Sequence, residues 1–424
     1  MRGRVEAMYR PAGERGEIVV YAGDLAVTVG DLKPRPVRGQ LELRLSGAPR
    51  FFARFVGPHS QLDFLDPWSG VERSVAVPHT APLTPPTESV LPEDPGDISW
   101  VDDRITMNEL EAGVATVAKR FVFHISGALQ SSSFPNVEVL GGGRQPQLRF
   151  GLSGWDLVIA QVDGRGGENG FGFVVEGRPE FPISSADVDK LRRRLFILLS
   201  FMAGREVGVG PVCGLDDDGD LIWAKWAVPR MRPGRPGVRW CPPILFATAF
   251  SEIVEGVGGL SKDVLREAVV ERAINHLLAA NGNEPLDVRV PIACSGLEML
   301  GTAVLQRHGK KVPGQAACKV RQLLVWAGVP VTIPAGFASL AARSGRHTTI
   351  ADGPEVLFGI RNKLVHPPMK MTEWPSSAEL KESWQLANWY LELVVLRELD
   401  YEGKYWSRLR LGRQAADLEP VPWA

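Results

Sequence analysis

A short segment near the C-terminal end of the sequence combines an arginine and a histidine at a spacing that suits phosphodiester cleavage. The segment Gly359–Pro368 reads GIRNKLVHPP and places Arg361 and His366 at the end of an apolar-periodic run. A guanidinium stabilises negative charge that develops on a phosphate, and an imidazole moves a proton. Asn362, directly after the arginine, adds a polar side chain. The pair indicates ribonuclease chemistry.

A helix over Pro354–Val365, with Asp352 as its N-cap, is predicted to position this pair. In an unbroken helix His366 would be rotated about 140° from Arg361, because each residue turns about 100°. Pro367 disfavours helical backbone at the residue before it, so the helix should end there. His366 can then turn toward the side of Arg361. The sequence therefore predicts an Arg–His site at a helix end.

A purely structural role for the same residues stays open. An arginine near a helix C-terminus interacts favourably with the helix dipole, and a histidine before a proline can cap the last carbonyl groups. The surrounding elements must decide between the two interpretations.

Composition narrows the class of protein. The 424 residues suffice for two or three domains, and the net charge of −1 provides no global attraction for nucleic acid, so any such contact needs a local basic patch. The four cysteines are too widely spaced for a zinc site, and a disulfide framework is not expected at this size. No segment has the length of a membrane span and the first 16 residues lack the apolar stretch of a signal peptide, so a cytoplasmic protein without membrane contact is expected.

The chain is expected to have an α+β organisation in two parts. Residues 1–240 alternate in the manner of strands, form a mainly β recognition or sensor region, and contain one embedded helix near 185–203. Pro229–Pro243, rich in proline and glycine, marks the boundary. Residues 241–424 then follow helical periodicity and are expected to form an all-α bundle. Its predicted helices cover residues 244–257, 262–280, 288–307, 316–327, 336–343, 354–365 and 377–399.

The segment Arg361–His366 resembles the R-x4-6-H motif of HEPN domains, helical bundles common in prokaryotic defence and toxin–antitoxin ribonucleases. Asn362 matches the polar residue that follows the arginine in that motif. The resemblance covers about residues 244–411. A mainly β region ahead of such a bundle is similar to the ApeA-type abortive-infection proteins, although no specific N-terminal motif matches.

The resemblance implies a metal-independent endoribonuclease without a cofactor, active in antiphage defence. His366 would take the proton from a ribose 2′-OH or protonate the leaving 5′-oxygen, Arg361 would hold the scissile phosphate, and Asn362 would support either group. Attack by the 2′-OH excludes DNA as a substrate. The resemblance also implies RNA as the partner, tRNA included, a homodimer through the helical domain, and a phage-derived trigger at the N-terminal domain.

Further contacts are expected around this pair. Glu298, an acid within an apolar helix, is a candidate to orient Arg361 across the bundle, although a half-exposed helix position explains it as well. Basic residues near aromatic ones suit single-stranded nucleic acid, which needs both charge neutralisation and stacking surfaces. The residues predicted to contact RNA are Lys363, Lys310, Lys311, Arg321, Arg408 and Arg410.

Two other classes of protein remain as alternatives. The first is a non-catalytic HEPN-like interaction or dimerisation module joined to a β-rich ligand-binding domain. The second is a carbohydrate-binding or carbohydrate-processing protein, which the many tryptophans of the β region suggest but for which no carboxylate pair is identifiable. Side chains of Arg361 and His366 that converge on an open basic cleft would favour the enzyme.

Overall fold

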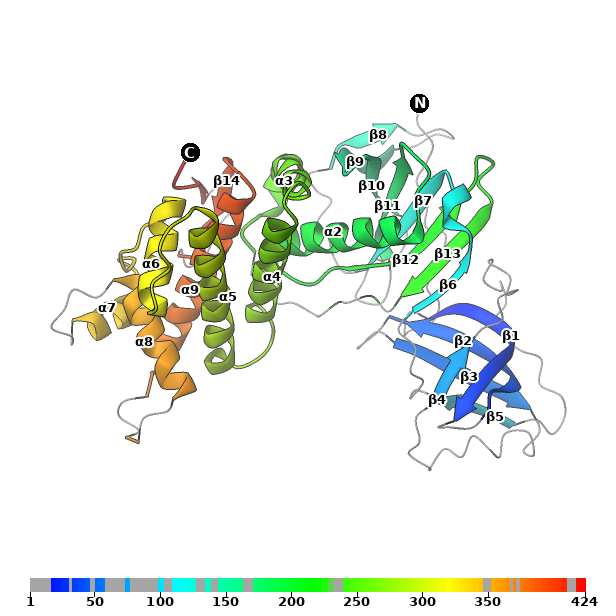
Figure 1. The fold of residues 1–424 in the computed structure, drawn as a ribbon, viewed down its shortest axis with the longest axis horizontal. Coiled ribbons are helices and arrows are strands. Elements are labelled where there is room, and N and C mark those ends of the chain that lie inside the picture. Colours follow the sequence, from blue (N-terminus) through cyan, green and yellow to red (C-terminus); the bar gives the residue numbers. More distant parts are fainter. Residues whose placement is uncertain are drawn as a thin grey trace. The chain divides into compact units, whose positions relative to one another are not determined.

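The computed structural model describes residues 17–29, 33–45, 50–57, 73–76, 98–102, 109–126, 134–138, 144–162, 171–227, 229, 231, 239–345, 352–366, 369–370, 374–409 and 417–424. The chain divides into two compact units (Figure 1). The β-rich unit comprises Met1–Leu129, Pro135–Phe196 and Val207–Met231. The helical unit comprises Gln130–Phe134, Ile197–Glu206 and Arg232–Ala424. The helical unit therefore also includes two short stretches that precede the proline-rich boundary.

The first sheet of the β-rich unit has five antiparallel strands in the order β4-β1-β2-β3-β5. Apolar residues alternate along its strands, so that Leu41 and Leu43 of one strand and Phe51, Ala53 and Phe55 of the next are buried in one core. The strands are β1 (Glu17–Val29), β2 (Arg35–Arg44), β3 (Arg50–Gly57), β4 (Arg73–Ala76) and β5 (Ile98–Asp102).

The second sheet has eight strands in the order β6-β13-β12-β7-β11-β10-β9-β8, again antiparallel. Residues Asp216–Asp220 form the turn of the β12–β13 hairpin, in which the Asp216 carboxylate accepts backbone N–H groups of Asp218 and Asp220 at 3.0 and 2.8 Å. The strands are β6 (Glu109–Gly113), β7 (Arg120–Ser126), β8 (Asn136–Glu138), β9 (Arg144–Leu152), β10 (Trp155–Gln161), β11 (Phe171–Pro179), β12 (Gly208–Leu215) and β13 (Leu221–Ala227).

Helix α2 (Ser185–Ala203) is the embedded helix predicted near 185–203. Its first half is tied to the second sheet by ion pairs and hydrogen bonds. Lys225 of β13, 5% exposed, places its ammonium 2.6 Å from Asp189 and 3.6 Å from Glu111. Ser185 donates to the same glutamate at 2.8 Å. A lysine so deeply buried is tolerated because two carboxylates neutralise it.

His124 of β7 is expected to make the protein sensitive to mild acid. Its side chain is fully buried, with Nδ1 2.9 Å from the carbonyl oxygen of Pro211, and burial lowers its pKa to about 4. The unfolded chain, with an ordinary histidine pKa near 6.5, binds this proton at a higher pH than the folded chain does. The free energy of unfolding should therefore fall by up to about 3 kcal/mol as the pH drops from about 6.5 to 4.

Urea unfolding of the β-rich unit between pH 7 and 4 measures this change in the free energy of unfolding. In His124→Phe this part of the pH dependence should disappear, whatever the stability of the variant at pH 7. An unchanged slope in the variant would contradict the assignment to His124.

The helical unit confirms the predicted order of helices. Ser376 caps the last long helix by accepting the backbone N–H of Glu379, whose carboxylate accepts the Ser376 N–H in return. The helices are α3 (Phe246–Leu260), α4 (Val264–Ala280), α5 (Leu286–Arg307), α6 (Ala316–Ala327), α7 (Ala338–Ser344), α8 (Gly353–Val365) and α9 (Ser377–Glu398). A two-stranded sheet, β14 (Lys404–Trp406) with β15 (Leu418–Pro420), follows them.

Helix α5 lies at the centre of this unit and packs against α4, α6, α8 and α9 (Figure 1). Helix α6 runs beside α5 in the same direction. Gly301 of α5 lies against Lys319, and seven residues further along each chain the rings of His308 and Trp326 are 5.2 Å apart. A mainly β N-terminal region is thus followed by a helical region, as the sequence predicts.

Although no such segment was expected from the sequence, two apolar segments among the described residues of this unit have the length and composition of a membrane span, Pro243–Leu260 and Leu286–Arg307. The second is more than half buried within the bundle, as expected of a core helix, and its Arg289 and Arg307 contact polar groups of the same unit. Burial against other helices accounts for its apolar character.

Candidate active site at the end of helix α8

The helix that carries the Arg–His pair begins as predicted. The Asp352 carboxylate accepts the backbone N–H of Glu355 at 3.0 Å, and Pro354 occupies the first turn. Arg321 of α6 binds the same carboxylate with two nitrogen atoms, Nη2 at 3.0 Å, and reaches Glu355 at 3.3 Å. One aspartate therefore both caps α8 and joins it to α6.

His366 ends the helix. Its backbone N–H still closes the last helical turn with the carbonyl oxygen of Asn362 at 2.7 Å, but its own φ of −123° and ψ of 81° are not helical. The side chain is exposed. The predicted helix end at Val365 is confirmed, and the imidazole lies where solvent and a substrate can reach it.

Arg361 is half-buried, one and a half turns before the histidine. Its Nη1 donates to the Asn362 side-chain oxygen at 3.1 Å, whereas its Nε is buried and finds no acceptor within the part of the chain that the structure describes. Asn362 thus contacts both members of the predicted pair, Arg361 through its side chain and His366 through its backbone. Because Nε faces the interior of the bundle, a phosphate oxygen could reach only the terminal nitrogens of the guanidinium.

Behind Arg361 lies the buried thiol of Cys294 in α5. Burial raises the pKa of this thiol to about 12, the charge of Arg361 opposes that shift, and the charge of Glu298 reinforces it. Cys294 is therefore a protonated, buried thiol on which the charge of Arg361 acts. It is not an activated nucleophile.

Glu298 does not form the expected ion pair with Arg361. Its carboxylate lies 3.1 Å from the ammonium group of Lys319 on α6, one turn along α5 from Cys294. Glu298 pairs with Lys319 because α6 packs directly against this face of α5. Helix periodicity alone does not reveal this pairing.

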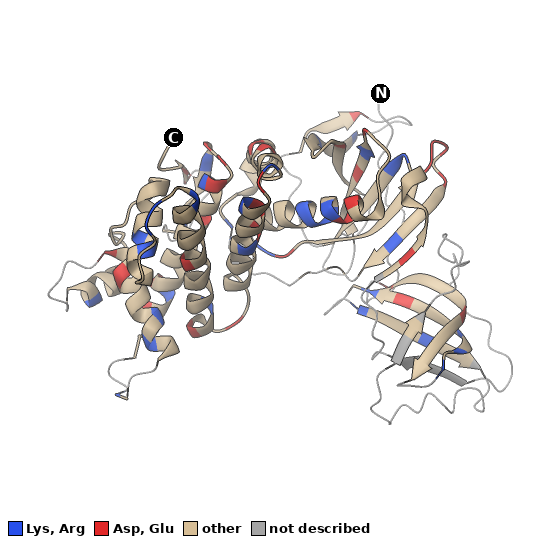
Figure 2. Ribbon diagram, in the orientation of Figure 1, with Lys and Arg blue, Asp and Glu red and all other residues tan. Residues whose placement is uncertain are grey.

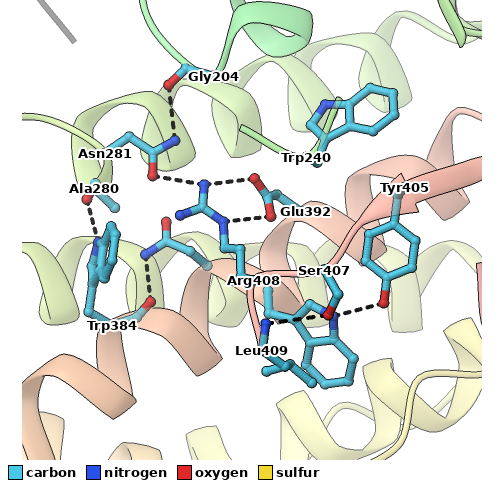
Figure 3. A network of polar contacts seen from close by, with 12 residues as sticks. Gly204, Trp240, Ala280, Asn281, Trp384, Glu392, Tyr405, Ser407, Arg408 and Leu409 are labelled. Carbon is cyan, nitrogen blue, oxygen red and sulfur yellow. Dashed lines mark hydrogen bonds and ion pairs between the residues drawn. The ribbon is translucent and has the colours of Figure 1, made fainter. Parts of the chain in front are cut away.

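The expectation that Arg408 contacts RNA is corrected by its burial (Figure 3). Its side chain is 1% exposed and forms a two-pronged ion pair with Glu392 of α9, at 2.6 Å from Nε and 2.7 Å from Nη2. Nη2 also donates to the Asn281 side-chain oxygen at 3.0 Å. A guanidinium enclosed in this way has no face left for a phosphate.

The same network ties the C-terminal segment to the bundle. Asn281, which follows α4, donates in turn to the carbonyl oxygen of Gly204 at 3.0 Å (Figure 3). The Arg408 guanidinium lies 5.6 Å from the ring centre of Trp384, whose indole N–H donates to Ala280 at 2.7 Å. Arg408 is therefore a structural anchor, since it joins the C-terminal segment to α9 through Glu392 and Trp384 and to the end of α4 through Asn281.

The other residues predicted to contact RNA differ in how accessible their side chains are to a phosphate. Lys310 and Lys311 are exposed in the loop after α5, and Lys363 is half-buried on α8. Arg321 is committed to Asp352 and Glu355, so an RNA phosphate would have to compete with two carboxylates. Arg410 lies outside the described residues. The loop lysines are thus the most accessible of the set.

Asp352→Ala is expected to loosen α8 at its start. The change removes the N-cap and leaves Arg321 without its main partner, which should lower the free energy of unfolding by about 1–2 kcal/mol. Glu355→Ala is the matched control, because that carboxylate is exposed and contacts Arg321 at 3.3 Å only. Thermal unfolding followed at 222 nm should show a midpoint lower by several degrees in Asp352→Ala alone. Equal midpoints in the two variants would contradict the capping role.

Sequence reasoning did not identify Cys294 and Lys319 as neighbours of the site. Both precede Arg361 by more than 40 residues, and their side chains are ordinary for helices. The only signal in the sequence was the interruption of an apolar helix by Glu298, which correctly marked the face of α5 that meets charged groups.

Two family models match parts of the chain. The YopA central domain matches residues 178–237, and the YopA C-terminal domain matches residues 263–419, which includes the whole of α8 and α9. The protein is thus similar to YopA-type proteins over α2 with the hairpin that follows it and over most of the bundle.

One curated relative is the SPbeta prophage-derived uncharacterized protein YopA of Bacillus subtilis (strain 168). It is 27% identical over 248 residues, which are 56% of this chain and 54% of the relative. The chain therefore spans about half the length of that protein. No solved structure matches the chain.

Proposed function

We propose that the protein is a metal-independent endoribonuclease whose site lies at the end of α8. The observation that carries the proposal is the position of Asn362, which hydrogen-bonds the Arg361 guanidinium and, through its backbone, the turn that presents His366. An exposed imidazole and a half-buried guanidinium, held by Asn362 through Nη1, then lie on one helix end. These are the two groups that RNA cleavage by the neighbouring hydroxyl requires.

The reaction proceeds by in-line displacement. His366 removes the proton of the ribose 2′-OH, O2′ forms a bond to the phosphorus, and the bond to O5′ breaks as that oxygen takes up a proton from water. Arg361 donates N–H bonds to the non-bridging oxygens, where negative charge accumulates. The products are a 2′,3′-cyclic phosphate and a 5′-hydroxyl end. DNA lacks the attacking hydroxyl and is not a substrate.

The resemblance to HEPN domains supports a homodimer through the helical unit, with two Arg–His sets, in the cytoplasm. A prophage-derived relative supports a role in conflict between phage and host, with a phage component as the trigger at the β-rich unit. Size-exclusion chromatography with light scattering tests the dimer: a mass of one chain at all concentrations would contradict it.

The activity test uses purified full-length protein with total RNA or tRNA in the presence of EDTA. We expect cleavage products that carry 2′,3′-cyclic phosphate ends. Cleavage that appears only after a divalent metal is added, or products with 3′-hydroxyl ends, would contradict the mechanism.

A non-catalytic interaction module is the second candidate. It is favoured by the buried Nε of Arg361, which shows that part of the guanidinium faces its own bundle. In that case wild type and His366→Ala would leave RNA equally intact, and pull-down of a partner by the helical unit would depend on Arg361.

A further inference from the structure

Six basic or aromatic side chains lie at one end of the helical unit. We call them the basic–aromatic end: His308, Lys310, Lys311, Trp326, Arg397 and Trp423. His308 follows α5 and Trp326 is in the last turn of α6, and because these helices run in the same direction their ends meet, with the two rings 5.2 Å apart and inclined by 41°. Both helices therefore deliver an aromatic ring to the same place.

The end of α9 and the C-terminal residues complete this surface. Arg307, the last residue of α5, lies 2.5 Å from Glu398, the last residue of α9. The guanidinium of Arg397 lies 5.5 Å from the ring centre of Trp423. Trp423 in turn lies against Gly328, which caps α6. Figure 1 shows the α5–α6 loop at the same end of the bundle as the C-terminus.

The charge of this surface is available to a ligand. Lys310 and Lys311 are exposed, and no carboxylate of the described part of the chain pairs with either ammonium. Figure 2 shows the loop that carries them in blue. Glu398, which pairs with Arg307 at the end of α5, is fully buried and is shared by Arg266 and Arg307. The exposed groups of the loop are thus cationic.

An acidic hollow limits the surface on one side. It measures about 530 Å³ and is lined by four carboxylates, Glu252 and Glu255 of α3 with Asp400 and Glu402 after α9. A phosphate chain is repelled there and attracted to the lysines of the α5–α6 loop. Charge therefore directs a polyanion along the α5 and α6 side.

This surface is separate from the site at α8. Cys294, which lies beside Arg361, precedes His308 by 14 residues on α5, or about 20 Å at 1.5 Å per residue. A ligand that touches both places must be an extended chain. A mononucleotide cannot reach from one to the other.

We propose that the basic–aromatic end docks single-stranded RNA for the site at α8, a substrate class that rests on the proposed ribonuclease function. Lys310 and Lys311 neutralise backbone phosphates, while unpaired bases stack on the half-buried faces of Trp326 and Trp423. A duplex keeps its bases paired and stacked on each other, so it cannot use the rings. Unpaired regions are therefore preferred.

Binding is measured separately from cleavage with full-length His366→Ala and a fluorescein-labelled 20-residue poly(U), by fluorescence anisotropy between 50 and 300 mM salt. Each lysine that contacts a phosphate contributes about 0.7 to the slope of log affinity against log salt. Lys310→Ala/Lys311→Ala should therefore reduce that slope by about 1.4, twice the value for one lysine. Trp326→Ala should weaken binding about tenfold with the slope unchanged.

Lys33→Ala/Lys190→Ala removes the same charge from the β-rich unit and should leave both affinity and slope as they are. Double-stranded RNA of equal length should bind more weakly and be insensitive to Trp326→Ala. Wild-type affinity in both the lysine and the tryptophan variants, or equal loss on duplex RNA, would overturn the docking surface. Intact binding without cleavage by wild type would contradict the ribonuclease proposal and leave the docking surface standing.

Discussion

His366→Ala should lower the rate of RNA cleavage by about 10²–10⁴-fold, the usual contribution of a positioned acid–base group. Arg361→Ala should produce a comparable loss, because the charge on the pentacoordinate phosphate would lose its fork of N–H donors. Arg361→Lys should recover little, since an ammonium restores the charge and not the planar pair of donors. Single-turnover cleavage of labelled tRNA in EDTA measures all three variants.

The matched control is His276→Ala. His276 is a half-buried histidine of α4 whose Nδ1 contacts the carbonyl oxygen of Arg272 within its own helix. Its loss should leave the cleavage rate within a few-fold of wild type. Equal rates in wild type and His366→Ala would remove the mechanism, and equal losses in His276→Ala and His366→Ala would indicate a folding defect in place of a catalytic one.

Asn362→Ala tests the contact of the Asn362 side chain with Arg361 separately from the backbone contact of Asn362 with His366. The asparagine side chain holds Arg361, whereas its backbone bond to His366 survives the substitution. Cleavage should therefore fall less than in Arg361→Ala, with the larger part of the effect in substrate affinity. A loss as large as that of His366→Ala would show that the side chain itself takes part in the proton transfer.

Glu392→Gln should destabilise the helical unit by about 3–5 kcal/mol. The substitution keeps the shape of the side chain but leaves the Arg408 charge fully buried without its counter-ion, and removal of one partner of a buried pair costs more than loss of the pair itself. Urea unfolding followed at 222 nm should show the transition of the helices at a clearly lower midpoint.

Two further variants make this result specific. Lys190→Ala breaks an exposed pair with Asp187 at 3.0 Å and should change the free energy of unfolding by less than about 0.5 kcal/mol. Glu392→Leu/Arg408→Met removes both charges and should recover part of the stability lost in Glu392→Gln. A wild-type midpoint in Glu392→Gln would mean that Arg408 finds other compensation.

Local sequence signals predicted the helices and their ends well. The aspartate before Pro354 and the apolar period of each helix act within a few residues, so their physical effect can be read directly from the chain. The same holds for the end of α8 before Pro367. Arg361, Asn362 and His366 could be singled out because they lie within six residues on one such element.

Contacts between distant residues were not predictable in this way. Arg408 looked like a surface cation because its neighbours Lys404 and Arg410 are basic, yet it is buried against Glu392 and Asn281. Glu298 was expected at Arg361 and pairs with Lys319, and the rings of His308 and Trp326 meet only because α6 runs beside α5 in the same direction. In each case the sequence contains several possible partners for the side chain, and only the packing of the helices determines which one it contacts.

By itself, then, the amino-acid sequence determined the α+β organisation, the helix that carries the Arg–His pair and the residue at which it ends. These depend on backbone preferences and apolar period, which are local. Tertiary structure alone decided which cations stay exposed, namely Lys310 and Lys311 and not Arg408. That choice depends on which helices pack together, because a charge is buried only where the fold brings its counter-charge within hydrogen-bonding distance.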